Sequence, residues 1–159
     1  MTVNDSKIQL VTFELGNETY GIDIMDVKEI VSLCEIRPIP GTPAYVAGIM
    51  NLRGVIIPII DLHNRFQLEK PNLSEDDELL SGYIIISIDG VEIGIVIDKV
   101  SRVLTVEAND IQSPPQMMSG IGSEYIRGVI HIEEEYLIFL NIRRIFDSQE
   151  LQQLYKMSK

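Results

Sequence analysis

One stretch decides the fold: Gly48-Ile49-Met50-Asn51-Leu52-Arg53-Gly54-Val55-Ile56-Ile57-Pro58-Ile59-Ile60-Asp61-Leu62. It contains two runs dense in apolar and β-branched residues, 46–52 and 55–60, which are typical of β-strands. Arg53-Gly54 separates the runs, and glycine tolerates the positive φ or the close backbone approach that a tight turn requires. The stretch therefore predicts a β-hairpin with Arg53 at its turn.

The composition of the whole chain shows the same bias. The 159 residues include 26 Ile and 12 Val but only three Ala. Branched side chains pack well on pleated sheets, whereas in helices they lose χ1 freedom. We therefore expect a mostly β protein.

Other elements can be placed along the chain. Hairpin turns are predicted at Gly16-Asn17, at Asp89-Gly90 and at 133–135. A short helix is predicted over 24–31, where the apolar residues recur at helical spacing. A C-terminal helix is predicted over 147–157 because a capping-box pattern precedes an apolar stripe there.

The two halves of the chain resemble each other. Residues 21–31 align with 94–104 at an offset of 73, and residues 45–52 align with 125–132 at an offset of 80. Two matches in the same order indicate that each half is one structural unit, and five short strands in each suit a small barrel.

The expected architecture is two packed five-stranded β-barrel subdomains, with short helices and a C-terminal helix. The first subdomain is expected over 8–66 and the second over 82–146, separated by an acidic mobile linker over 67–81. The repeat fits barrels built from contiguous halves and also barrels that exchange terminal strands.

Charge and cysteine content limit the partners and the compartment. Thirteen Lys and Arg against 24 Asp and Glu give a net charge of −11, which repels nucleic-acid phosphates and anionic lipid headgroups. Residues 1–7 lack the layout of a signal peptide, and Cys34 has no second cysteine for an internal disulfide. We expect a cytoplasmic protein that binds no nucleic acid and does not insert into a membrane.

Catalytic and metal-binding patterns are hard to find. His63 and His131 have no metal-ligand partner at a familiar spacing, and His131 is expected to be an ordinary surface residue. Gly120-Ile121-Gly122 lacks the third glycine of a phosphate-binding loop, and the carboxylates at 75–78 lack the alternation of a calcium loop. Cys34 has no base nearby in the sequence. We expect no metal and no cofactor, and no motif in the sequence assembles a catalytic group.

Arg53 and Glu29 each allow two interpretations. Arg53 could pair with a local carboxylate, or its planar guanidinium could bind carboxylates or carbonyls of a partner. Glu29 lies beside Val27 and Ile30, so it belongs either to a solvated face or to the polar rim of an apolar docking surface.

The residues around these positions resemble a known family. Tyr20-Gly21-Ile22-Asp23-Ile24, then Val27-Lys28-Glu29-Ile30, the segment 38–43 and the opening stretch 48–62 are similar to the bacterial chemotaxis coupling family CheW. The similarity runs from about Gln9 to Leu154. The fold of the family is two SH3-like barrels with a hydrophobic interface, which agrees with the repeat. Members of the family have no catalytic activity.

The resemblance also implies partners and a location. It implies an adaptor that couples the cytoplasmic tips of methyl-accepting chemotaxis receptors to the regulatory domain of the histidine kinase CheA, recruited to membrane-associated arrays. By position, the receptor-binding residues are Val27, Glu29, Ile30, Val31 and Arg53, and the kinase-binding residues are Pro114, Pro115, Gln116 and Met117. Met117 stands where an aromatic residue is frequent. The alternative function is a small-ligand-binding or catalytic β-barrel, which requires a concave pocket with convergent polar groups.

Overall fold

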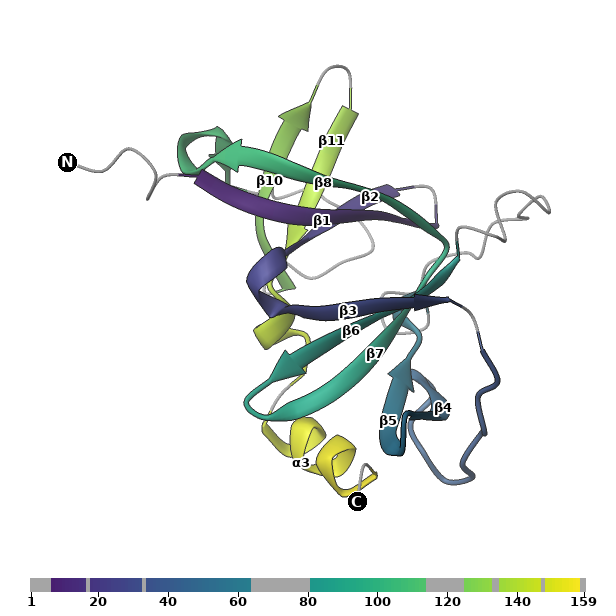
Figure 1. Cartoon of the computed structure of the whole chain (residues 1–159). Coiled ribbons are helices and arrows are strands. Elements are labelled where there is room, and N and C mark those ends of the chain that lie inside the picture. The colour runs from purple at the N-terminus through teal and green to yellow at the C-terminus, as the bar shows by residue number, and fades with distance from the viewer. Residues whose placement is uncertain are drawn as a thin grey trace.

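The computed structural model describes residues 7–16, 18–32, 34–63, 81–113, 125–132, 135–146 and 148–157. These residues form two β-sheets and a C-terminal helix, α3 (Ser148–Met157), as Figure 1 shows. The mostly β class and the C-terminal helix are confirmed, and the two expected five-stranded units appear as one sheet of six strands and one of five. No helix in the described ranges is long and apolar enough to cross a membrane.

The strands divide into a six-stranded and a five-stranded sheet. The first sheet contains β1 (Lys7–Leu15), β2 (Glu18–Asp23), β8 (Lys99–Glu107), β9 (Ile111–Gln112), β10 (Ile126–Ile132) and β11 (Glu135–Leu140). The second sheet contains β3 (Val27–Ser32), β4 (Val46–Leu52), β5 (Val55–Ile60), β6 (Gly82–Ile88) and β7 (Val91–Ile97). Their orders are β8-β1-β2-β11-β10-β9 and β3-β6-β7-β5-β4. Three 3-10 helices also form: η2 (Ile24–Asp26), η3 (Ala108–Asp110) and η5 (Ile142–Arg144).

Each sheet takes strands from both halves of the chain. The first sheet combines β1 and β2 with β8 to β11, and the second combines β3 to β5 with β6 and β7. The strands from different halves meet in parallel pairs, β2 with β11 and β7 with β5. Neither sheet is therefore built from one contiguous range, such as 8–66 or 82–146.

The sequence repeat reappears in these parallel pairs. Phe139 pairs with Gly21 in the first sheet, and Ile59 pairs with Gly94 in the second. The two pairs are related by the same offsets, 80 and 73, that align the two halves of the sequence. Each repeat thus gives its first two strands to one sheet and its later strands to the other.

The prediction of a helix over 24–31 is wrong. Only η2 is helical, and the Asp23 carboxylate caps it by accepting the Met25 N–H at 3.0 Å. The rest of the segment is strand β3, which pairs with β6 and has a bulge between Val27 and Glu29. The bulge interrupts the period-two alternation. This interruption is why the apolar residues of the segment show helical spacing.

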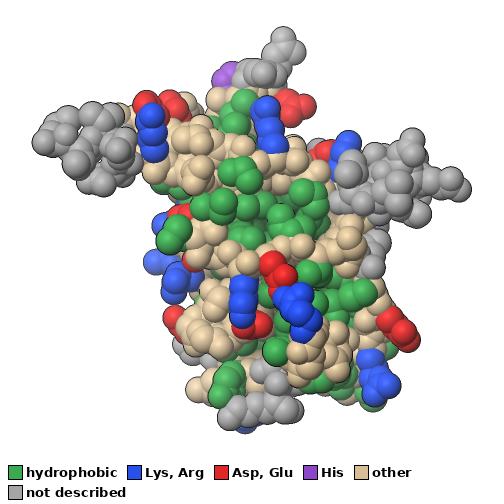
Figure 2. Space-filling model, in the orientation of Figure 1, with side chains coloured by type: hydrophobic (Ala, Val, Ile, Leu, Met, Phe, Trp, Pro, Cys, Tyr) green, Lys and Arg blue, Asp and Glu red, His purple; other side chains and the backbone are tan. Residues whose placement is uncertain are grey.

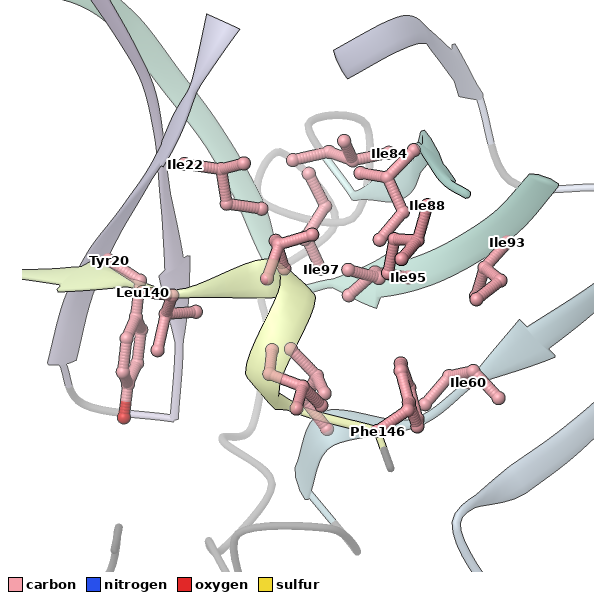
Figure 3. Packing of buried hydrophobic residues seen from close by; sticks show 14 of the residues in the cluster. Tyr20, Ile22, Ile60, Ile84, Ile88, Ile93, Ile95, Ile97, Leu140 and Phe146 are labelled. Carbon is pink, nitrogen blue, oxygen red and sulfur yellow. The ribbon is translucent and has the colours of Figure 1, made fainter. Parts of the chain in front are cut away.

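Strands are buried on both faces, which explains the long apolar runs of the sequence. Tyr83 and Ile85 of β6 belong to an apolar cluster within the second sheet, whereas Ile84 and Ile86 belong to the cluster between the sheets. The first sheet has its own inner cluster, in which Leu10 of β1 packs with apolar residues of β8, β10 and β11. Figure 3 shows side chains from the two sheets pointing toward one another in the cluster between them.

The C-terminal helix packs on the second sheet. It contacts β5 and β7, with Leu154 buried, Leu151 half-buried and Tyr155 exposed. Residue 147, the expected N-cap, lies outside the described residues. The predicted apolar stripe therefore docks on the sheet through its leucines, whereas Tyr155 faces solvent.

Gly94 marks a close approach of two strands. A Cβ atom there would lie 2.5 Å from Cδ1 of Ile59 on the parallel partner strand. We expect Gly94→Val to lower the free energy of unfolding by about 1–3 kcal/mol, the usual range for overpacking. Urea denaturation measures this, with Ser87→Val at an exposed position of the neighbouring strand as the control. Equal effects of both substitutions would contradict the packing argument.

A second prediction concerns α3. Leu154 is 1% exposed, so Leu154→Ala should lower the free energy of unfolding by about 2–5 kcal/mol through lost burial and a cavity. Gln153→Ala, at the adjacent exposed position, should change it by about 0.5 kcal/mol or less. Thermal or urea unfolding of the two variants compares them directly, and a negligible effect of Leu154→Ala would mean that the helix contributes little.

Candidate functional site

The hairpin between β4 and β5 presents Arg53 to solvent. Arg53 and Gly54 have φ values of 51° and 88°, which are those of a tight two-residue hairpin turn. The Asn51 side chain accepts the Gly54 N–H at 2.9 Å. The turn predicted from the sequence is confirmed, and the Arg53 side chain, 68% exposed, projects from it.

Arg53 forms an ion pair with Glu29 on β3. Its Nη2 donates to Glu29 Oε1. β3 and β4 are opposite edges of the second sheet, so this contact shows that the sheet curls until one edge faces the β4–β5 turn. The local pairing considered for Arg53 is therefore present. A pair with an exposed guanidinium contributes at most about 1 kcal/mol to stability, so a partner's carboxylate or carbonyl can replace Glu29 at small cost.

The other predicted receptor-binding residues lie on β3 beside this pair. Ile30 is 42% exposed and is one of six large hydrophobic side chains that face solvent among the described residues. Val27 packs against the cluster between the sheets, and Val31 packs against the inner cluster of the second sheet. The structure thus brings Glu29 and Arg53 together next to an exposed Ile30. Val27 and Val31 instead pack toward the interior.

Figure 2 shows the setting of this surface. Hydrophobic side chains gather across the middle of the face, and acidic and basic side chains lie in contact beside them. In the same orientation, β3 crosses the front of the molecule (Figure 1). A second ion pair links Lys28 of β3 to Glu92 of β7, across the intervening strand β6. An apolar area with a polar rim is the usual composition of a protein docking surface.

Two hollows in the described part of the chain lie on different sheets. One of about 190 Å³ lies between β1, β8 and β11 and is lined by residues that include Thr12, Arg102 and Tyr136. Another, of about 490 Å³, is an open depression beside Cys34 and Arg37.

Sequence reasoning missed the environment of His63. This side chain is 2% exposed, with Nδ1 2.9 Å from Asp61 Oδ1 and Nε2 2.8 Å from Asp98 Oδ2. Burial lowers the pKa of His63, but the hydrogen bonds to Asp61 and Asp98 and their negative charges outweigh burial and raise it to about 9. Asp61 lies two residues before His63, and this spacing is a local signal from which the contact could have been predicted. Asp98 is 35 residues away, and no local pattern points to it. His131 is exposed, as expected, and its ring lies 4.8 Å from that of Tyr136.

Two predicted features are not described. The kinase-binding residues Pro114, Pro115, Gln116 and Met117 lie outside the described residues, in the sequence between β9 and β10. Residues 64–80, which include almost all of the expected linker, also lie outside them. Ser81, at the end of that segment, is buried and donates its hydroxyl to the Asp98 carbonyl at 2.6 Å.

Comparison with known proteins decides the family, because residues 9–150 match the CheW-like domain. The chain belongs to the CheW family. It is 54% identical over 154 residues to the chemotaxis protein CheW of Treponema pallidum, covering 97% of this chain and 91% of the relative. It is 36% identical to the chemotaxis protein CheW of Klebsiella aerogenes, covering 90% and 84%.

A solved structure supports the CheW assignment. The crystal structure of the scaffolding protein TtCheW from Thermoanaerobacter tengcongensis matches this fold with a TM-score of 0.80 and 35% sequence identity, over 90% of each chain. The expected family and the SH3-like class of fold are therefore confirmed. The described edge strands β3 and β4 of the second sheet, and β8 and β9 of the first, are not hydrogen-bonded to each other, so the sheets curl without closing.

Proposed function

We propose that this protein is a non-catalytic adaptor that couples the cytoplasmic tips of methyl-accepting chemotaxis receptors to the regulatory domain of the histidine kinase CheA. Membership of the CheW family supports the proposal, since its relatives are named chemotaxis proteins and its structural neighbour is named a scaffolding protein. The observation that carries it is the exposed Ile30 beside the Glu29–Arg53 pair. This surface is suited to docking, not to chemistry.

The proposed receptor surface consists of Val27, Glu29, Ile30, Val31 and Arg53. A helical receptor tip would lay an apolar stripe against Ile30, which loses its remaining contact with water. Glu29 and Arg53 would form part of the polar rim, where the five N–H donors of a guanidinium can bind carboxylates or carbonyls of the receptor. Val27 and Val31 hold β3 in place from the inner side.

The proposed kinase contact is the segment Pro114, Pro115, Gln116 and Met117. Resemblance to the family supports this assignment, and a thioether at Met117 can replace an aromatic side chain as a flexible apolar contact. The segment follows β9 of the first sheet in the sequence, whereas the receptor surface belongs to the second sheet. The proposed adaptor works in the cytoplasm and reaches membrane-associated arrays through the receptors.

Arg53→Glu tests the receptor surface. It should abolish co-sedimentation of the purified protein with receptor-containing membranes, with and without CheA, because a second carboxylate replaces the donors and faces Glu29. The free energy of unfolding should change by about 1 kcal/mol or less, since the side chain is exposed. Arg144→Glu, another exposed arginine, is the matched control and should still co-sediment.

A double variant separates binding from structure. Glu29→Arg combined with Arg53→Glu keeps an ion pair between the two strands but reverses both charges. If the receptor binds the Arg53 donors, the double variant should remain unable to co-sediment. Restored binding would mean that the pair serves only to hold the hairpin. Normal binding by a folded Arg53→Glu protein would exclude this surface.

A further inference from the structure

Asp98 lies where the chain passes from the second sheet to the first, between β7 and β8. It is buried, and its Oδ2 accepts the Gly16 N–H at 2.7 Å. Its own backbone N–H donates to the Glu14 carbonyl at 3.1 Å. Gly16 and Glu14 belong to β1 and the turn that follows it, so these bonds hold Asp98 to the first sheet.

His63 approaches the same carboxylate from the second sheet. It follows β5, and both its backbone N–H and its Nδ1 lie 2.9 Å from Asp61 Oδ1. Its Nε2 lies 2.8 Å from Asp98 Oδ2. The ring thus spans two buried carboxylates, one at the end of β5 and one attached to the first sheet.

With both carboxyl groups ionised, this geometry requires both ring nitrogens to donate. A neutral imidazole has one N–H and one lone pair, so either tautomer would turn a lone pair toward a carboxylate oxygen. Only the imidazolium satisfies both contacts. A buried cation between two carboxylates also removes the cost of leaving those negative charges unpaired away from water.

We propose that His63 is a proton-dependent fastener between the two sheets: its imidazolium holds Asp61, at the end of the second sheet, to Asp98, which is bound to the first. Loss of the proton loosens this junction. The proposal goes beyond the adaptor function and does not depend on it.

Other charged groups near the junction are consistent with this role. Lys99, next to Asp98 on β8, lies 3.9 Å from Glu14 on β1, and both side chains are partly exposed. Solvent therefore screens that pair. The groups that face the His63 ring within the described ranges are Asp61 and Asp98. Deprotonation of His63 takes away the cation that lies between them.

The direction of the pH dependence follows from the pKa. The pKa of His63 is raised from 6.5 to about 9 in the folded protein. A group whose pKa is higher when folded stabilises the protein fully below its unfolded pKa, and this contribution is lost as the pH rises through the folded value. The stability that His63 contributes therefore declines between about pH 6.5 and 9, whereas in the folded protein the junction itself loosens as His63 loses its proton near pH 9.

Titration and unfolding of the full chain test the proposal. In NMR, the ring protons of His63 should titrate well above pH 6.5, and this measurement needs no variant. The urea midpoint should fall as the pH rises from 6.5 to 9.5. His63→Gln should have a low midpoint that does not change over this window, and His131→Gln should keep the wild-type profile. An ordinary titration of His63, or a wild-type profile in a folded His63→Gln protein, would overturn the proposal.

Hydrogen exchange distinguishes a fastener from a general stabiliser. At pH 7, His63→Gln should speed exchange of the Gly16 and Asp98 amides several-fold more than exchange of amides in the middle of either sheet, such as that of Ile85. His63→Arg keeps a permanent cation and should protect the two junction amides better than His63→Gln does. Equal acceleration at all of these amides would mean that His63 stabilises the whole fold without fastening the junction.

Discussion

Burial of both faces of each central strand is the constraint on which the structure depends. β6 alternates between the inner cluster of its own sheet, through Tyr83 and Ile85, and the cluster between the sheets, through Ile84 and Ile86. A flat pair of sheets can cover only one face of each strand, so each sheet must also curl around its own inner cluster. At roughly 25 cal/mol per Å² of apolar surface, leaving either face of such a strand in water would cost several kcal/mol. The curl brings the edge strand β3 to the β4–β5 turn, where Glu29 meets Arg53.

Strand exchange makes the two sheets dependent on each other. Because each repeat contributes its first two strands to one sheet and its later strands to the other, neither half of the chain contains a complete sheet. The parallel pairs that join the halves need close contact, and glycine provides it at Gly21 and Gly94, where a Cβ would meet a side chain of the partner strand. The surface around Arg53 therefore rests on hydrogen bonds contributed by both repeats.

The parts of the fold that local sequence decides were predictable, and the parts that depend on distant contacts were not. The hairpin at Arg53-Gly54 follows from apolar runs around a turn glycine, and its bounds agree with the structure. The helix predicted over 24–31 failed because a bulge in β3 hides its alternation. The exchange of strands pairs residues more than a hundred positions apart, such as Gly21 and Phe139, and a repeat fits it equally well with and without exchange. At the candidate site, the sequence allowed Arg53 and Glu29 either a local structural role or a role in binding a partner. Only the structure shows that they are partners.

Burial decides what each of the two charge clusters can do. In the Glu29–Arg53 pair the Arg53 side chain is 68% exposed and the Glu29 side chain 29%, so water reaches both partners when the pair separates, and the pair adds little to stability. Its charges can therefore be offered to another protein at small cost to the fold. The Asp61–His63–Asp98 cluster is almost fully buried, and removing its central cation would leave two carboxylates with poor hydration. The cluster therefore stabilises the folded state, and its buried charges cannot be reached by a partner. The same ionic chemistry thus serves recognition at the surface and attachment between the sheets in the interior.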